Sequence, residues 1–206
     1  MASEEIPILQ VKPGMSVAEV DRAAKLRLNY SSLSDNSAIV VDQPVRISYP
    51  DPDHGFELPP SRFVWLPQYA GTLAGIQTTT SLAYLDLKSA HETALVLMEK
   101  LRAAGWAAVE TYPNDWATVE RANNRKNPGD ELRKTYGKWR LGTVTADVYV
   151  KEHSNSPGAL PGPQFLPGID IMDWTLQDII EKKVFARRQE VNGSVNKTLP
   201  LSEWVK

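Results

Sequence analysis

Two helix starts of the same kind, Ser16-x-x-Glu19 and Ser89-x-x-Glu92, constrain the fold more than any other feature of this sequence. In such a capping box the serine side chain accepts a hydrogen bond from the backbone three residues later, and the glutamate side chain returns to the serine N–H. Short segments rich in β-branched residues follow each start. This pattern is typical of an α+β protein. We therefore expect antiparallel sheets with helices packed on one face.

The first helix is predicted over residues 16–28, and a Pro13-Gly14 turn precedes it. The second is predicted to begin at Ser89 and to carry an apolar stripe through Leu101. Gly105 stands where a Schellman ending requires a left-handed residue, and Trp106 would then pack on Leu101. Further helices are predicted from Pro113 through Ala122 and from Thr175 through Val184.

The predicted strands are short, and turn signals separate them. We expect strands at 39–41, 45–49, 63–66, within 72–87, at 106–110, around a hairpin at Gly142-Thr143, and at 169–171. Gly142-Thr143 fits a two-residue type II′ turn. Residues 29–37 and 123–135 are expected as polar loops, 154–168 as a linker rich in proline and glycine, and 186–198 as a polar tail.

The length of 206 residues fits a single domain, since domains commonly have about 150 residues. The two capped helices favour a sharper alternative, in which 1–87 and 88–206 are two similar α/β halves whose sheets lie side by side. Direct residue matching between these halves is poor.

Charge and composition narrow the classes of function. The net charge is −2 and the pI about 6.0, so the basic footprint of a nucleic-acid-binding protein is absent and we expect no nucleic-acid partner. No apolar run approaches the roughly 20 residues that cross a bilayer, so we expect no transmembrane segment. The sequence has no cysteine, which excludes disulfides, thiolate metal sites and cysteine nucleophiles.

Motifs of catalysis are weak. The sequence has no Gly-x-Ser-x-Gly elbow, and Gly71-x-x-x-Gly75 lacks the continuation of a phosphate loop. Asp51, Asp53 and His54 form either a turn or an oxygen-rich cation site. Two carboxylates near the predicted strands could share a cleft, where different pKa values would let one act as an acid and the other as a base. The candidates are Asp147, Asp170 and Asp173. We interpret His91 as an exposed residue in the first turn of the second helix. We expect no cofactor.

Aromatic and basic residues favour recognition of a protein. Tryptophan outnumbers phenylalanine, six to four, and tryptophan and tyrosine are enriched at interfaces. Basic residues gather around Tyr136 and Trp139, and they are Arg121, Arg125, Lys126, Arg133, Lys134, Lys138 and Arg140. This stretch is interpreted as a solvated loop or as a patch facing an acidic partner. The candidate partner-binding residues are Asp51, Asp53, His54, Phe56, Tyr136 and Trp139.

Residues 9–20, Leu-Gln-Val-Lys-Pro-Gly-Met-Ser-Val-Ala-Glu-Val, resemble the opening of small envelope lipoproteins of the SmpA/OmlA type. The resemblance implies two helices on a three-stranded antiparallel sheet and a role in outer-membrane assembly. The lipidated cysteine of that family is absent here. A turn followed by a capped helix explains the same residues locally.

The leading hypothesis is a non-enzymatic protein-binding module of the bacterial envelope, of the inhibitor or immunity type. It would occlude a partner enzyme, toxin-like or from the envelope, by inserting loop 50–60 or 154–168, whose prolines lower the entropy lost on docking. The alternatives are an envelope-assembly or scaffold component, and a metal-dependent hydrolase that uses Asp51, Asp53 and His54. We expect a periplasmic location with a signal segment removed, and the cytoplasm is the alternative.

Overall fold

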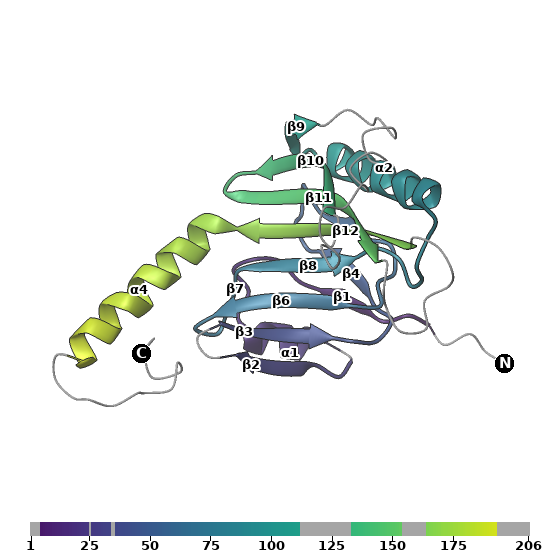
Figure 1. The fold of residues 1–206 in the computed structure, drawn as a ribbon. Helices are drawn as coiled ribbons and strands as arrows, with labels where there is room; N and C mark the ends of the chain where they lie inside the picture. The colour runs from purple at the N-terminus through teal and green to yellow at the C-terminus, as the bar shows by residue number, and fades with distance from the viewer. Residues whose placement is uncertain (1–4, 25, 34–35, 112–132, 154–163, 193–206) are drawn as a thin grey trace, which may run out of the picture.

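The computed structural model describes residues 5–24, 26–33, 36–111, 133–153 and 164–192. It is an α+β protein built on one large, strongly curved sheet (Figure 1). The predicted fold class is confirmed. The helix predicted from Pro113 to Ala122, the basic residues Arg121, Arg125 and Lys126, and the linker positions 154–163 lie outside the described residues.

The large sheet has nine strands, and every pair within it is antiparallel. In spatial order the strands are β2 (Asn29–Leu33), β3 (Asn36–Val41), β6 (Val64–Tyr69), β8 (Gly75–Thr79), β12 (Gln164–Asp173), β11 (Val144–His153), β10 (Arg133–Leu141) and β9 (Ala107–Thr111). The short strand β7 (Thr72–Leu73) pairs with β6 beside this path.

The order of elements along the chain occurs twice. Helix α1 (Val17–Ala23) precedes β2, β3, β6 and β8, and helix α2 (Leu87–Ala103) precedes β9, β10, β11 and β12. Each set of four strands occupies one side of the sheet, and β8 pairs with β12 at the middle.

A second, three-stranded sheet consists of β1 (Ile8–Gln10), β4 (Arg46–Tyr49) and β5 (Phe56–Glu57). Strands β1 and β4 pair in parallel, which is the exception to the antiparallel expectation. Leu9 and Ile47 of this sheet are fully buried in the same core as α1 and α2.

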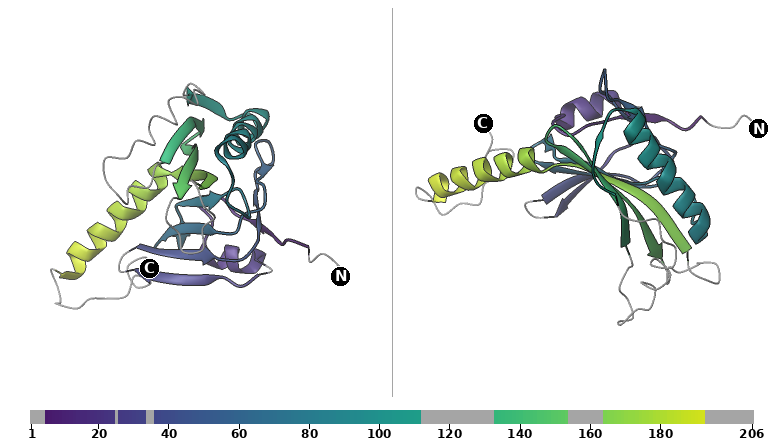
Figure 2. Two further views of the ribbon diagram at one scale, coloured as in Figure 1. Left: turned by 45° about the vertical axis from the view of Figure 1, so that its right-hand side comes forward. Right: turned by 90° about the horizontal axis from the view of Figure 1, so that it is seen from above.

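The core lies on one face of the large sheet. Both views of Figure 2 place α1 and α2 on this side. Buried residues of the central strands β8, β11 and β12 form this core. They include Ile76, Val148 and Ile169, which pack with Leu97 and Leu101 of α2. We call this side the covered face. The opposite side, which carries Trp65, Gln77, Tyr149 and Asp170, is called the open face.

Helix α1 begins as predicted but ends early. Ser16 is its N-cap, and Ser16 and Glu19 form the complete capping box. Ala24 has an extended backbone and ends the helix, so the prediction to residue 28 was wrong. The predicted loop at 29–37 was also wrong, because β2 and β3 pair there as a hairpin. Strand β2 lies at the sheet edge, where a polar sequence is compatible with pairing on one side only.

Helix α2 begins one turn earlier than predicted. Asp86, and not Ser89, is the N-cap, and its carboxylate accepts the Ser89 N–H at 2.9 Å. The predicted ending is confirmed: Gly105 has φ +79°, and the Trp106 N–H donates to the Leu101 carbonyl at 3.0 Å. The helix therefore ends in a Schellman motif.

The hairpin of β10 and β11 is confirmed. Leu141 pairs with Val144, Gly142 has φ +59°, and Thr143 has no positive φ, as a type II′ turn requires. A register shift between Thr135 and Gly137 inserts one extra residue. Because of this bulge, Tyr136 and Trp139 both face α2, although they stand three residues apart.

Two predicted connections are strands. Residues 133–135 belong to β10, and residues 164–168 belong to β12 in the middle of the sheet. Pro167 and Gly168 are residues typical of turns, but here both pair with neighbouring strands in the middle of the sheet. Helix α4 (Trp174–Asn192) starts directly after β12 and projects from the body, so it is longer than predicted and includes part of the expected tail (Figure 1).

Candidate functional site

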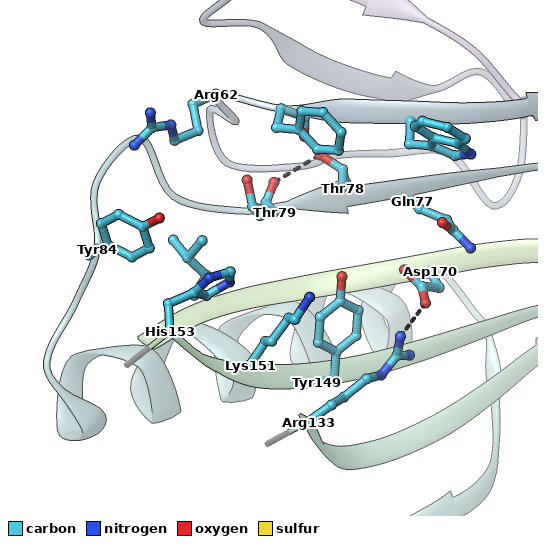
Figure 3. Close-up of a pocket in the computed structure, with 13 residues that line it drawn as sticks. Arg62, Gln77, Thr78, Thr79, Tyr84, Arg133, Tyr149, Lys151, His153 and Asp170 are labelled. Atoms are coloured by element: carbon cyan, nitrogen blue, oxygen red, sulfur yellow. Dashed lines mark hydrogen bonds and ion pairs between the residues drawn. The ribbon is translucent and has the colours of Figure 1, made fainter. Parts of the chain in front are cut away.

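A cavity of about 510 Å³ opens on the open face (Figure 3). Its walls come from β6, β8, β10, β11 and β12 and from the segments that flank them. The lining residues are Arg62, Phe63, Trp65, Gln77, Thr78, Thr79, Tyr84, Arg133, Tyr149, Lys151, His153, Leu166 and Asp170. The cavity therefore combines aromatic rings with charged groups of both signs.

The floor of the cavity is a stack of three residues. Tyr149 stands directly opposite Gly168 in the β11–β12 pair, and a Cβ on Gly168 would lie 2.5 Å from the tyrosine ring. Glycine therefore lets the ring lie against the sheet. The Arg133 guanidinium lies 3.8 Å from the centroid of this ring. The strands thus hold an arginine flat over a buried tyrosine.

Asp170 joins this stack. Its Oδ2 accepts a hydrogen bond from Arg133 Nη1 at 2.7 Å, as Figure 3 shows. Burial raises the pKa of the Asp170 carboxyl above its ordinary value, whereas Arg133 and a hydrogen bond from Tyr149 act in the opposite direction. Burial also raises the pKa of the Tyr149 hydroxyl. Asp147 stands opposite Asp170 in the register, so two of the three predicted carboxylates do come together.

The upper rim is fixed by buried hydroxyl groups. Ser61 Oγ donates to the Phe63 carbonyl at 2.7 Å and receives the Thr78 hydroxyl at 2.8 Å. These bonds fix the turn that carries Arg62 and Phe63. The Arg62 guanidinium lies 5.8 Å from the Tyr84 ring centroid, and the Tyr84 and His153 rings are 5.5 Å apart. The rim therefore presents a cation beside an aromatic ring.

The predicted cluster Asp51, Asp53 and His54 forms a turn away from this cavity. Asp51 Oδ1 accepts the backbone N–H groups of Asp53 and His54 at 3.2 and 3.0 Å, and the His54 bond is the main reason that the pKa of Asp51 is lowered. His54 Nδ1 is 2.8 Å from the Ala104 carbonyl at the end of α2. This arrangement holds the turn against the helix C-terminus.

The aromatic candidates also lie elsewhere. Phe56 stacks on Tyr49 at 5.5 Å between centroids and meets Trp106 edge-on. Tyr136 and Trp139 are each 1% exposed and pack beneath α2 on the covered face. Of the six predicted binding residues, the structure brings Asp51, Asp53, His54 and Phe56 together at one end of α2. None of the six lines the cavity.

His91 is buried, at 8% exposure, and not exposed as expected. Its ring lies 5.4 Å from the Tyr136 ring, and burial lowers its pKa. Among the described residues, no group of three histidine, aspartate or glutamate side chains is arranged to hold a metal ion. The geometry around His54 thus adds no support to the metal-dependent alternative.

Sequence reasoning named Arg133 and Asp170 separately and did not name Tyr149 or Trp65 as part of a site. A signal was present in β11. Ala146, Val148 and Val150 face the core, so the alternate residues Asp147, Tyr149 and Lys151 must share the other face. The basic stretch was interpreted as a loop, but as strand β10 it places Arg133 and Lys138 on the open face.

Comparison with protein-family models, curated proteins and solved structures finds no significant match. The resemblance of residues 9–20 to SmpA/OmlA-type lipoproteins accordingly stays a prediction. No helix within the described ranges has the length and hydropathy needed to cross a membrane.

Proposed function

We propose that the protein is a protein-binding module that docks its partner on the open face of the large sheet. One observation carries this proposal. The same strands pack one face against α1 and α2 and present on the other face a cavity with aromatic rings, arginines and a paired carboxylate. Aromatic and arginine side chains around a pocket are the composition of binding hot spots.

This proposal moves the binding surface from the loops to the sheet. Loop 50–60 was the first candidate for insertion into a partner, but His54 and Phe56 are tied to Ala104 and Trp106 at the end of α2. Leu58 in the same loop is 3% exposed. A segment held in this way packs against the core and is not available for insertion into a partner. An inhibitor built on the open face would instead cover the partner's cleft with a broad, rigid surface.

The experiment is affinity capture with two arginine substitutions. Gln77 lies at the centre of the open face, between Trp65 and Asp170 in the register, whereas Val96 is exposed on the outer surface of α2. The tagged wild type, Gln77→Arg and Val96→Arg are each incubated with an extract of the source organism. Retained proteins are identified by mass spectrometry.

We expect one protein to be retained by the wild type and by Val96→Arg and to be lost with Gln77→Arg. Loss of an enzymatic activity of that protein on binding would support the inhibitor form. A retained protein of envelope-assembly machinery would instead favour the scaffold alternative and the periplasmic location. Retention that is the same for Gln77→Arg, or no retention by the wild type, would contradict docking on the open face.

A further inference from the structure

Arg133 is ordered by its contacts with Tyr149 and Asp170 and keeps donors that can bind a second carboxylate. Its guanidinium is stacked on Tyr149 and bonded through Nη1 to Asp170, and its side chain is still 39% exposed toward the cavity. An arginine carries five N–H donors in a rigid plane, so one carboxylate at Nη1 leaves donors on the other edge. Because the side chain is already ordered, a ligand would lose little conformational entropy in binding it.

The charge balance of the cavity favours an anionic ligand. Arg62 and Arg133 line it, and Asp170 is the sole carboxylate among the described residues of its wall. The whole chain has a net charge of −2, so this local excess of positive charge runs against the overall balance. A recess with an excess of one charge sign between apolar walls attracts groups of the opposite charge.

The walls favour a flat apolar group beside that anion. Phe63 is 40% exposed at the rim, and Trp65, Tyr84 and Leu166 contribute further apolar surface to the cavity. The Arg62 guanidinium already lies over the Tyr84 ring. An aromatic side chain that enters here can stack on a ring while a neighbouring carboxylate reaches Arg133.

We propose that the cavity binds the carboxylate side chain of an acidic residue of the partner, presented next to an aromatic residue. Arg133 receives the carboxylate, and the ring of Trp65, which stands beside Gln77 and Asp170 in the register, receives the aromatic group. This inference rests on the proposed function and names the chemistry that the open face recognises.

The test uses two blocked dipeptides that differ only in charge, acetyl-Trp-Glu-amide and acetyl-Trp-Gln-amide. Binding to the full chain is followed by chemical-shift changes in ¹⁵N-labelled protein at millimolar peptide. We expect the glutamate peptide to bind at least about tenfold more tightly, as one charge-assisted pair allows. Shifts should be centred on Gln77, Tyr149 and Leu166.

Two variants assign the preference to Arg133. Arg133→Met should reduce the difference between the peptides to less than about twofold, since the donor fork and the charge are both lost. Lys138→Met is the matched control, because Lys138 stands on the same face of β10 but outside the cavity and should leave the preference unchanged. Equal binding of the two peptides, or no binding of either, would overturn the proposal.

A third probe, 3-phenylpropionate, distinguishes a partner residue from a free small acid. If it binds more tightly than the glutamate peptide, the cavity takes a free acid and the partner assignment is wrong. The failure of this inference is separable from that of the proposed function. If Gln77→Arg abolishes capture but the two peptides bind equally, the open face is still the docking surface. The inference that it binds an acidic residue of the partner is then wrong.

Discussion

The covered and the open face are made by the same strands, and they differ in what their polar groups do. On the covered face, Trp139 and Tyr136 are 1% exposed, yet neither Trp139 Nε1 nor the Tyr136 hydroxyl has a hydrogen-bond partner within the described structure. On the open face, Arg133 and Asp170 bond to each other at 2.7 Å in partial contact with solvent. The covered face is organised by packing, and the open face by paired polar groups.

This difference teaches how the fold separates stability from recognition. Burying a side chain under α2 removes apolar surface from water at about 25 cal/mol per Å². A partly exposed ion pair contributes little to stability but fixes the direction of its donors. We therefore expect substitutions of the covered face to change the free energy of unfolding, and substitutions of the open face to change binding.

The largest effect should come from a matched pair of tryptophans. Trp139→Ala removes a fully buried ring beneath α2 and should cost about 3–5 kcal/mol of the free energy of unfolding. Trp65→Ala, at a partly exposed position of the open face, should cost about 1–2 kcal/mol. Urea denaturation of both variants, compared at equal m-values, measures the difference. Equal losses would mean that the open face is as fully packed as the covered face.

The next effect tests the stack on the open face. In Gly168→Ala the new methyl group would lie 2.5 Å from the Tyr149 ring and 2.8 Å from the Thr78 carbonyl oxygen. The carbonyl belongs to the neighbouring strand and cannot move freely, so we expect a loss of about 1–3 kcal/mol. Chemical denaturation gives the loss, and the aromatic NMR signals of Tyr149 should shift. An unchanged tyrosine spectrum would contradict the close approach of ring and glycine.

The sequence predicted those parts of the fold whose signals are local. Ser16 with Glu19, Gly105 with Trp106, and Gly142 with Thr143 each define a cap or turn within a few residues, and the structure contains all three. Asp86 replaced Ser89 as the second N-cap because either side chain can accept the orphan N–H groups of a helix start. That 1–87 and 88–206 are two similar α/β halves stays a prediction.

The site was less predictable because long-range register assembles it. Gly168 looked like a linker residue, but its role is to leave room for Tyr149 on another strand. Arg133 and Asp170 were visible as separate charges, and only the order of β10, β11 and β12 brings them together. Alternation along β11 was present in the sequence and could have indicated the open face, but it was used only to predict the hairpin.

A smaller effect concerns pH and the pair on the open face. Burial raises the pKa of Asp170 and Arg133 lowers it, so Arg133→Met should raise that pKa further. An acid whose pKa is higher in the folded state than in the unfolded chain loses stability as the pH rises through the folded pKa. Arg133→Met should therefore cost more at pH 7 than at pH 3. The extra cost should stay below about 1 kcal/mol, since solvent screens the partly exposed arginine.

Carboxyl carbon NMR titration of Asp170 measures this pKa directly, and urea unfolding at the two pH values gives the stability difference. Lys138→Met is the control, because it removes a charge from the same strand without touching Asp170. If Arg133→Met left the pKa of Asp170 unchanged or lowered it, the pairing seen on the open face would not persist in solution.

The smallest effect returns to the covered face. Tyr136→Phe removes only a hydroxyl group, and that hydroxyl has no hydrogen-bond partner within the described residues. A buried hydroxyl without a partner carries a desolvation cost, so its removal should leave stability unchanged or raise it by up to about 1 kcal/mol. Denaturation of Tyr136→Phe beside the wild type measures this. A clear loss would show that the hydroxyl is bonded in solution, and the covered face would then share the paired polar chemistry of the open face.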